Sequence, residues 1–156
     1  MHSATTGFSR SPRSTRAATG FARLAFLVAS VGFYFSAGVS KLRESGLRWA
    51  DGHTIEFFIA LRGQETLLGS HVLEHSALFG VLGTIALFVE VGSPLALLSR
   101  RLRLLFVLGW ASMHLGIKLM MGPSYSQNVG CCVLLVDWGN VGAWLRARSA
   151  LAREWL

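Results

Sequence analysis

The sequence predicts an all-α integral membrane protein, a four-helix bundle with interfacial amphipathic helices. Of the 156 residues, 52% are hydrophobic and only 15% are charged, whereas about a quarter of the residues in a soluble domain are charged. Four apolar stretches alternate with polar or basic segments. The mean hydropathy of +0.47 agrees with a membrane class.

A transmembrane domain over residues 24–140 is expected between two basic ends. Residues 1–23 carry four arginines and no acidic residue, which favours a basic disordered cytoplasmic tail but is also typical of a transit peptide or a long signal n-region. Residues 141–156 mix tryptophan and leucine with arginine, which favours a basic amphipathic tail on the membrane. The net charge is +7, and the arginines that contribute to it cluster beside the apolar runs. It therefore predicts contact with the lipid bilayer and no binding of nucleic acid.

The first span is expected over about residues 24–40, and a polar connection follows it. Small residues recur in this span at spacings of four and three, which places them on one helix face that a neighbouring helix can approach closely: Ala25, Ala29, Gly32, Ser36 and Ser40. Within residues 41–75, the apolar spacing of Ile55, Phe58 and Ile59 predicts an interfacial helix, which Asp51 or Thr54 can cap. A second short helix is possible around residues 65–74.

Three further spans are expected over about residues 76–98, 104–121 and 125–138. Gly122 and Pro123 end the third. With four spans both termini lie on one side of the membrane. Lysine and arginine number ten on that side and at most five on the other. This asymmetry predicts cytoplasmic termini, in a bacterial inner membrane.

Four ionisable residues lie within or near the apolar stretches, where an isolated charge costs about 2.5 kcal/mol or more. Glu90 is expected to pair with the arginines at residues 100–103. His114 and Lys118 share one helix face with Trp110. His114 is either a structural hydrogen-bonding group or part of a site, and Lys118 either snorkels or faces that site. Asp137 is expected at the cytoplasmic interface.

No metal site is expected. Cys131 and Cys132 are adjacent, an arrangement unsuited to an unstrained disulfide, and two thiols alone do not form a zinc site. His71 and His75 are four residues apart but have no convincing further ligand. The two cysteines are therefore interpreted as packing residues.

One stretch resembles a known family. Residues 34–42 read YFSAGVSKL, and WADG follows at residues 49–52. Together they are similar to a segment of the membrane domain of vitamin K-dependent gamma-glutamyl carboxylase and of the bacterial HTTM proteins. The HLGI sequence at residues 114–117, with Met120 after it, resembles the later histidine-bearing helix of that family. The resemblance covers about residues 21–138.

This resemblance implies that Lys41 is a base, since it matches the second lysine of a Lys-Lys pair proposed to deprotonate reduced vitamin K. Ser40 stands in place of the first lysine. A lysine partly withdrawn from water can act as a general base near neutral pH; the alternative is a lysine that anchors a helix end. The family's earlier helices and large extramembrane domain are not matched, so complete carboxylation of protein glutamates is not expected. DoxX-type four-helix membrane proteins, associated with quinone-linked or thiol redox functions, are a second resemblance.

The hypothesis from the sequence is a small membrane protein that binds a quinone or another lipid-like ligand. Its candidate catalytic residues are Lys41 and His114, and its candidate ligand-binding residues are Trp110, Lys118 and Phe33. The alternative is a non-catalytic, DoxX-like or accessory subunit of a larger membrane complex, with a membrane-protein partner or a second copy of the chain. Whether the protein is an enzyme stays open.

Overall fold

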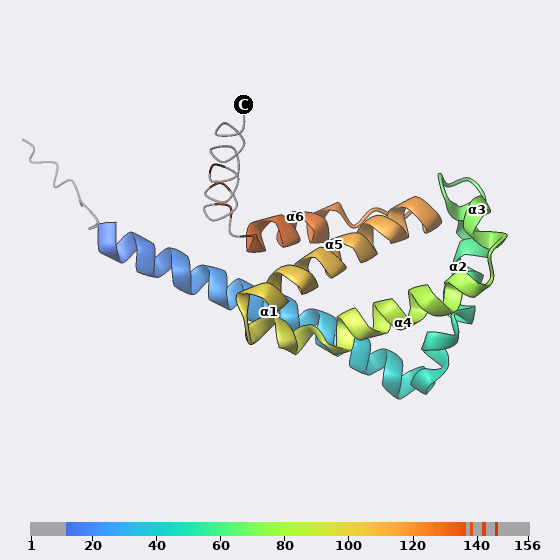
Figure 1. The fold of residues 1–156 in the computed structure, drawn as a ribbon, viewed down its shortest axis with the longest axis horizontal. Helices are drawn as coiled ribbons and strands as arrows, with labels where there is room; N and C mark the ends of the chain where they lie inside the picture. Colours follow the sequence, from blue (N-terminus) through green and yellow to red (C-terminus); the bar gives the residue numbers. More distant parts are fainter. Residues whose placement is uncertain (1–11, 137, 139–141, 143–145, 147–156) are drawn as a thin grey trace, which may run out of the picture.

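The computed structural model describes residues 12–136, 138, 142 and 146, and all regular structure in this part of the chain is helical (Figure 1). The elements in chain order are α1 (Pro12–Ser45), the 3-10 helix η1 (Gly46–Asp51), α2 (His53–Arg62), α3 (Gly69–Leu73), α4 (Ala77–Val91), the 3-10 helix η2 (Ser93–Leu97), α5 (Arg100–Met121) and α6 (Ser126–Leu135). The prediction of an all-α chain is confirmed.

Helices α1, α4, α5 and α6 run in alternating directions, while α2 and α3 lie together at one end (Figure 1). Helix α1 packs against α4 and η2, and α5 packs against α6 and η2. Neither Asp51 nor Thr54 caps α2 as predicted, because the N-cap residue is Gly52, which has no side chain to accept a hydrogen bond. Asp51 lies one residue earlier, and its side-chain oxygen accepts a hydrogen bond from the backbone N–H of His53 at 2.9 Å. Ile55 and Ile59 are buried, whereas Phe58 is exposed.

Two helix boundaries differ from the expected ones. Helix α1 begins at Pro12, so residues 12–23 of the expected disordered tail are helical. The expected second span is two elements, since α4 ends at Val91 and η2 follows it with Pro94 in its first turn. Proline has no backbone N–H to continue the α-helical ladder. Residues 1–11 and most of residues 137–156 lie outside the described residues.

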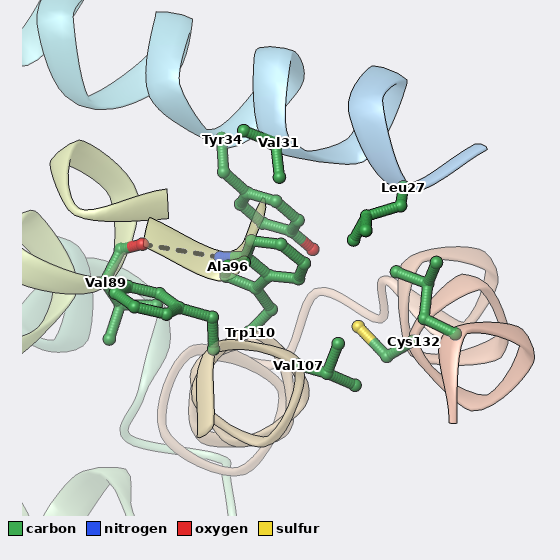
Figure 2. Packing of buried hydrophobic residues seen from close by; sticks show 10 residues of the cluster. Leu27, Val31, Tyr34, Val89, Ala96, Val107, Trp110 and Cys132 are labelled. Carbon is green, nitrogen blue, oxygen red and sulfur yellow. Dashed lines mark hydrogen bonds between the residues drawn. The ribbon is translucent and has the colours of Figure 1, made fainter. Parts of the chain in front are cut away.

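The main core joins five elements, α1, α4, η2, α5 and α6, around Trp110, whose side chain is completely buried (Figure 2). Leu27, Val31 and Tyr34 of α1 lie above it in this view, with Cys132 of α6 at the right and Val89 of α4 at the left. A smaller cluster of Ile55, Ile59 and Phe79 attaches α2 to the start of α4. The core therefore fixes the middle of α1 against the middle of α5.

The small-residue face of α1 is not its packed face, so that prediction is wrong. A Cβ added at Gly32 would meet no atom within 4 Å, and the other four members of the predicted stripe are exposed. The packed face carries Leu27, Val31, Tyr34 and Gly38 instead. Large side chains occupy most of this packed face, and Gly38 allows a close approach of α4.

Among the residues that the structure describes, two helical stretches are long and apolar enough to cross a membrane, judged by length and composition: residues 18–51 and α5. In each, only 22% of the most apolar window is buried inside the protein, unlike the core helix of a soluble domain. Large apolar side chains are exposed along the outer faces of three helices: Phe21, Leu24, Val28, Phe33, Phe35, Val81, Ile85, Phe88, Leu104, Leu105, Leu108 and Leu115. Apolar exposure on this scale marks an interaction surface.

Candidate functional site

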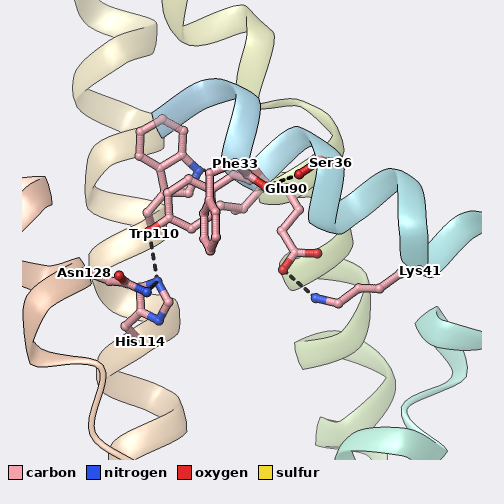
Figure 3. Close-up of polar contacts among 9 residues, drawn as sticks. Phe33, Ser36, Lys41, Glu90, Trp110, His114 and Asn128 are labelled. Carbon is pink, nitrogen blue, oxygen red and sulfur yellow. Dashed lines mark hydrogen bonds and ion pairs between the residues drawn. The ribbon is translucent and has the colours of Figure 1, made fainter. Parts of the chain in front are cut away.

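Lys41 and Glu90 form an ion pair between α1 and α4 (Figure 3). The ammonium group of Lys41 donates to Oε1 of Glu90, whose side chain is only 5% exposed, against 23% for Lys41. Glu90 was expected to pair with the arginines at residues 100–103, and that prediction is wrong. Lys41 is the partner of one oxygen of this buried carboxylate.

The pair forms because α1 and α4 touch at Gly38. A Cβ at this position would lie 2.9 Å from the Cβ of Glu90 and 2.9 Å from the backbone nitrogen of Val91. Only glycine permits this approach. Lys41 follows three residues later on the same helix face, so its side chain reaches Glu90. Glu90 is the penultimate residue of α4, which ends at Val91.

Trp49 of η1 covers the lysine. The Lys41 ammonium nitrogen lies 4.7 Å from the centre of the Trp49 ring, within the range of a cation–π contact. A Cβ at Gly83 of α4 would lie only 2.6 Å from the backbone oxygen of Trp49, so this glycine allows η1 to pack directly on α4. The polar connection after the first span thereby contributes a wall of the site.

Two buried polar atoms in this cluster have no hydrogen-bond partner among the described residues. They are Oε2 of Glu90 and the indole Nε1 of Trp49. A buried polar group without a partner is costly, and it calls for an explanation such as a missing ligand or water. The Lys41–Glu90–Trp49 cluster (called the ion-pair cluster below) therefore has one unused acceptor and one unused donor.

A second polar group surrounds His114 of α5. Its Nε2 lies 2.9 Å from the hydroxyl oxygen of Tyr34 and 3.3 Å from the amide nitrogen of Asn128. Since the amide nitrogen only donates, Nε2 is the acceptor, and the neutral ring carries its proton on Nδ1. Nδ1 is buried and has no partner in the described part of the chain. Figure 3 shows this histidine group apart from the ion-pair cluster.

Trp110 positions the histidine group. Its ring stacks on Tyr34 with 4.4 Å between centroids and 8° between planes, and its Nε1 donates to the backbone oxygen of Val89 at 3.4 Å. Trp110 thus links α1, α4 and α5. With no exposed surface, it acts in this structure as a packing residue.

The remaining predicted site residues make no described polar contact with either group. Phe33 is 59% exposed and contacts Tyr34 edge-on, with 5.4 Å between centroids. Lys118 is exposed near the end of α5. Asp137 lies outside the described residues. The structure therefore joins Lys41 with Glu90, and His114 with Tyr34 and Asn128, but does not gather the predicted set in one place.

Sequence reasoning missed three residues that contribute to these two polar groups: Tyr34, Asn128 and Trp49. Asn128 had a usable signal, because it is a polar amide near an apolar stretch. Tyr34 and Trp49 lie inside the stretch that carries the family resemblance, but nothing in that stretch indicates their partners. In the described residues, no group of three or more His, Cys, Asp or Glu side chains could hold a metal ion.

The ion-pair cluster has definite chemical capacities. A carboxylate and an ammonium group stabilise each other's charged forms when both leave water. A proton released by a ligand hydroxyl would be accepted by the unused Glu90 oxygen, since the ammonium group of Lys41 already carries three protons. The cluster can therefore hold a polar head and exchange a proton with it.

Comparison with protein-family models, with curated proteins and with solved structures finds no match to this chain.

Proposed function

We propose that this chain is a four-span membrane protein, with both termini cytoplasmic in a bacterial inner membrane, that binds a quinone or another lipid-like molecule at the ion-pair cluster. The observation that carries the proposal is the ion pair between Lys41 and Glu90, with the second oxygen of Glu90 buried and unused. Ionisable groups within membrane segments are expensive and mark functional sites by default.

The chemistry of the cluster favours a ligand with an apolar body and a small polar head. Lys41 and the Trp49 indole N–H are donors for a carbonyl oxygen, and Glu90 Oε2 is an acceptor for a hydroxyl group. Quinones and their reduced forms carry these two oxygen groups on an apolar ring. The exposed apolar faces of α1, α4 and α5 supply a path from the lipid.

In this proposal Lys41 and Glu90 act as one unit. Lys41 orients the carboxylate and offsets its charge, and the carboxylate accepts the proton of a bound hydroxyl group. The resemblance of residues 34–42 to the carboxylase and HTTM segment supports proton removal at this position. His114 belongs to a separate hydrogen-bonded group and supports the bundle around Tyr34.

Purification in a mild detergent, followed by solvent extraction and chromatography, tests the proposal. We expect about one quinone or similar lipid for each wild-type chain. Glu90→Gln and Lys41→Met should each reduce the retained ligand at least fivefold. Lys41→Arg keeps a cation beside Glu90 and should retain both the ligand and any proton removal, because in this proposal the carboxylate accepts the proton. Arg43→Met is the matched control, because Arg43 is an exposed cation two residues from Lys41 on α1. Equal retention in all variants would contradict the proposal.

A second candidate function is that of an accessory subunit of a larger membrane complex. The observation that favours it is the uncovered small-residue face of α1, where Gly32 has open space around it. Small residues on a lipid-facing helix permit close helix association. A protein that co-purifies in fixed stoichiometry and is lost in Gly32→Leu would favour this subunit function over ligand binding.

A further inference from the structure

A pocket opens at the bundle end where α5 begins and α6 ends. Six residues line it: Gly20, Arg23, Leu24, Leu27, Arg103 and Leu135. Two of them are arginines, from α1 and α5, and no acidic side chain is among the described residues that line it. This arginine pocket is remote from the ion-pair cluster, because Arg23 and Lys41 are separated by about 27 Å along α1.

The two guanidinium groups are held differently. Arg23 donates from Nη2 to the backbone oxygen of Leu135 at 3.1 Å, which fixes its side chain against the end of α6. The Nε of Arg103 is buried and has no hydrogen-bond partner in the described part of the chain. A buried N–H of a charged group without an acceptor is costly, and the described residues that line the pocket offer no acceptor at this position.

The rest of the lining is apolar and partly open. Leu27 and Leu135 are buried, while Leu24 is more than half exposed on the outer face of α1. A Cβ added at Gly20 would meet nothing within 4 Å. The pocket therefore places two cations beside an apolar surface that continues along the outside of α1.

We infer that the arginine pocket binds a phosphate group, either on a phospholipid headgroup or as free phosphate. Guanidinium groups bind phosphate oxygens with paired, charge-assisted hydrogen bonds. A phosphate oxygen would supply the acceptor that Arg103 Nε lacks, and Leu24 would lie beside an acyl chain. The phospholipid source relies on the proposed membrane location, whereas binding of free phosphate does not.

Native mass spectrometry of the full-length, delipidated protein in a nonionic detergent tests this inference. The probes are dioleoyl phosphatidylglycerol and dioleoylglycerol, which has the same chains without phosphate; binding of inorganic phosphate is measured by calorimetry. We expect one saturable site for phosphatidylglycerol and none for dioleoylglycerol. Tighter binding of phosphatidylglycerol than of inorganic phosphate identifies the lipid as the source, and equal binding identifies free phosphate.

Variants locate the site. Arg103→Gln should weaken binding about tenfold, the effect of losing one charge-assisted hydrogen bond. Arg101→Gln, an exposed arginine of the same helical turn, should change it less than twofold. If Arg103→Gln does not fold, Arg103→Lys keeps the charge without Nε and should still weaken binding. Quinone retention should not change in Arg103→Gln, which separates this inference from the proposed function.

Three results would overturn the inference. Dioleoylglycerol could bind as tightly as phosphatidylglycerol, or Arg101→Gln could lose as much affinity as Arg103→Gln. Alternatively, phosphatidylglycerol could bind to the Asp137→Asn variant but not to the wild-type protein. That result would mean that Asp137, two residues after Leu135 in the sequence, already supplies the acceptor for Arg103 Nε.

Discussion

Glu90 changes the interpretation of Lys41, because a lysine with a buried carboxylate partner differs from one that anchors a helix end. Each charge alone would be costly among apolar helices, and each is tolerated because the other is present. The pair is thus a structural element as well as a candidate site. Loss of function in a single variant would not distinguish these two contributions, so stability has to be measured beside it.

Replacing one partner of the Lys41–Glu90 ion pair should destabilise the protein more than replacing both. Lys41→Met leaves the Glu90 carboxylate unpaired and should lower the free energy of unfolding by about 3 kcal/mol. The double variant Lys41→Met, Glu90→Met should recover to within about 1 kcal/mol of wild type. Unfolding in detergent, followed by circular dichroism, measures both. A double variant no more stable than Lys41→Met would show that the two residues are not energetically coupled.

The hydrogen bond between Tyr34 and His114 should contribute measurably to stability. Tyr34→Phe keeps the ring stacked on Trp110 but leaves His114 without one buried partner, so we expect a loss of about 1–2 kcal/mol. Tyr125→Phe is the control, since the exposed Tyr125 ring lies 5.4 Å from that of His114 and its change should cost less than about 0.5 kcal/mol. Equal thermal stabilities for the two variants would argue against a stabilising role for the hydrogen bond between Tyr34 and His114.

At the level of the helix, two glycines of α1 allow a direct test of which face is packed. Gly38→Ala introduces a Cβ 2.9 Å from the backbone of Val91 and should cost about 1–3 kcal/mol. Gly32→Ala meets open space and should stabilise α1 by about 0.5–1 kcal/mol. The two variants have the same chemistry on the same helix. If Gly32→Ala were the more harmful variant, the small-residue face would be the packed one.

The sequence predicts the helices better than the contacts between them. The all-α class follows from long apolar runs and their breaks at residues such as Pro123, which are local properties. Which face of α1 packs is not local. Gly32 and Gly38 are equally able to admit a neighbouring helix, and only the position of α4 decides that Gly38 does so. Small residues are therefore an ambiguous signal in an apolar helix.

The candidate site shows the same division. Charge and polarity within apolar runs make Lys41, Glu90 and His114 visible in the sequence as residues of interest for a site. Their partners are not visible there, because Lys41 and Glu90 are 49 residues apart and the crossing of α1 and α4 brings them together. The prediction that Glu90 pairs with the arginines at residues 100–103 was wrong because it chose cations that are near Glu90 in the sequence.

For the whole molecule, the proposed topology makes a simple prediction. Reporter fusions at the C-terminus should report the cytoplasm, and a fusion after residue 60, beyond the middle of α2, should report the opposite side. The excess of lysine and arginine beside the termini is the reason. An alkaline phosphatase reporter and a fluorescent protein reporter give opposite signals and serve as mutual controls. An external C-terminus would be incompatible with four spans and a cytoplasmic N-terminus.

The ion pair also has a consequence for how the protein is made. In the proposed membrane topology, Lys41 leaves the ribosome 49 residues before Glu90, so α1 would reach the insertion machinery while its charge has no counter-ion. Helix α4 arrives with the complementary carboxylate, and each charge alone costs about 2.5–3.5 kcal/mol on insertion. The two helices are therefore expected to leave the translocon together, with α1 retained at its lateral exit until α4 has been synthesised.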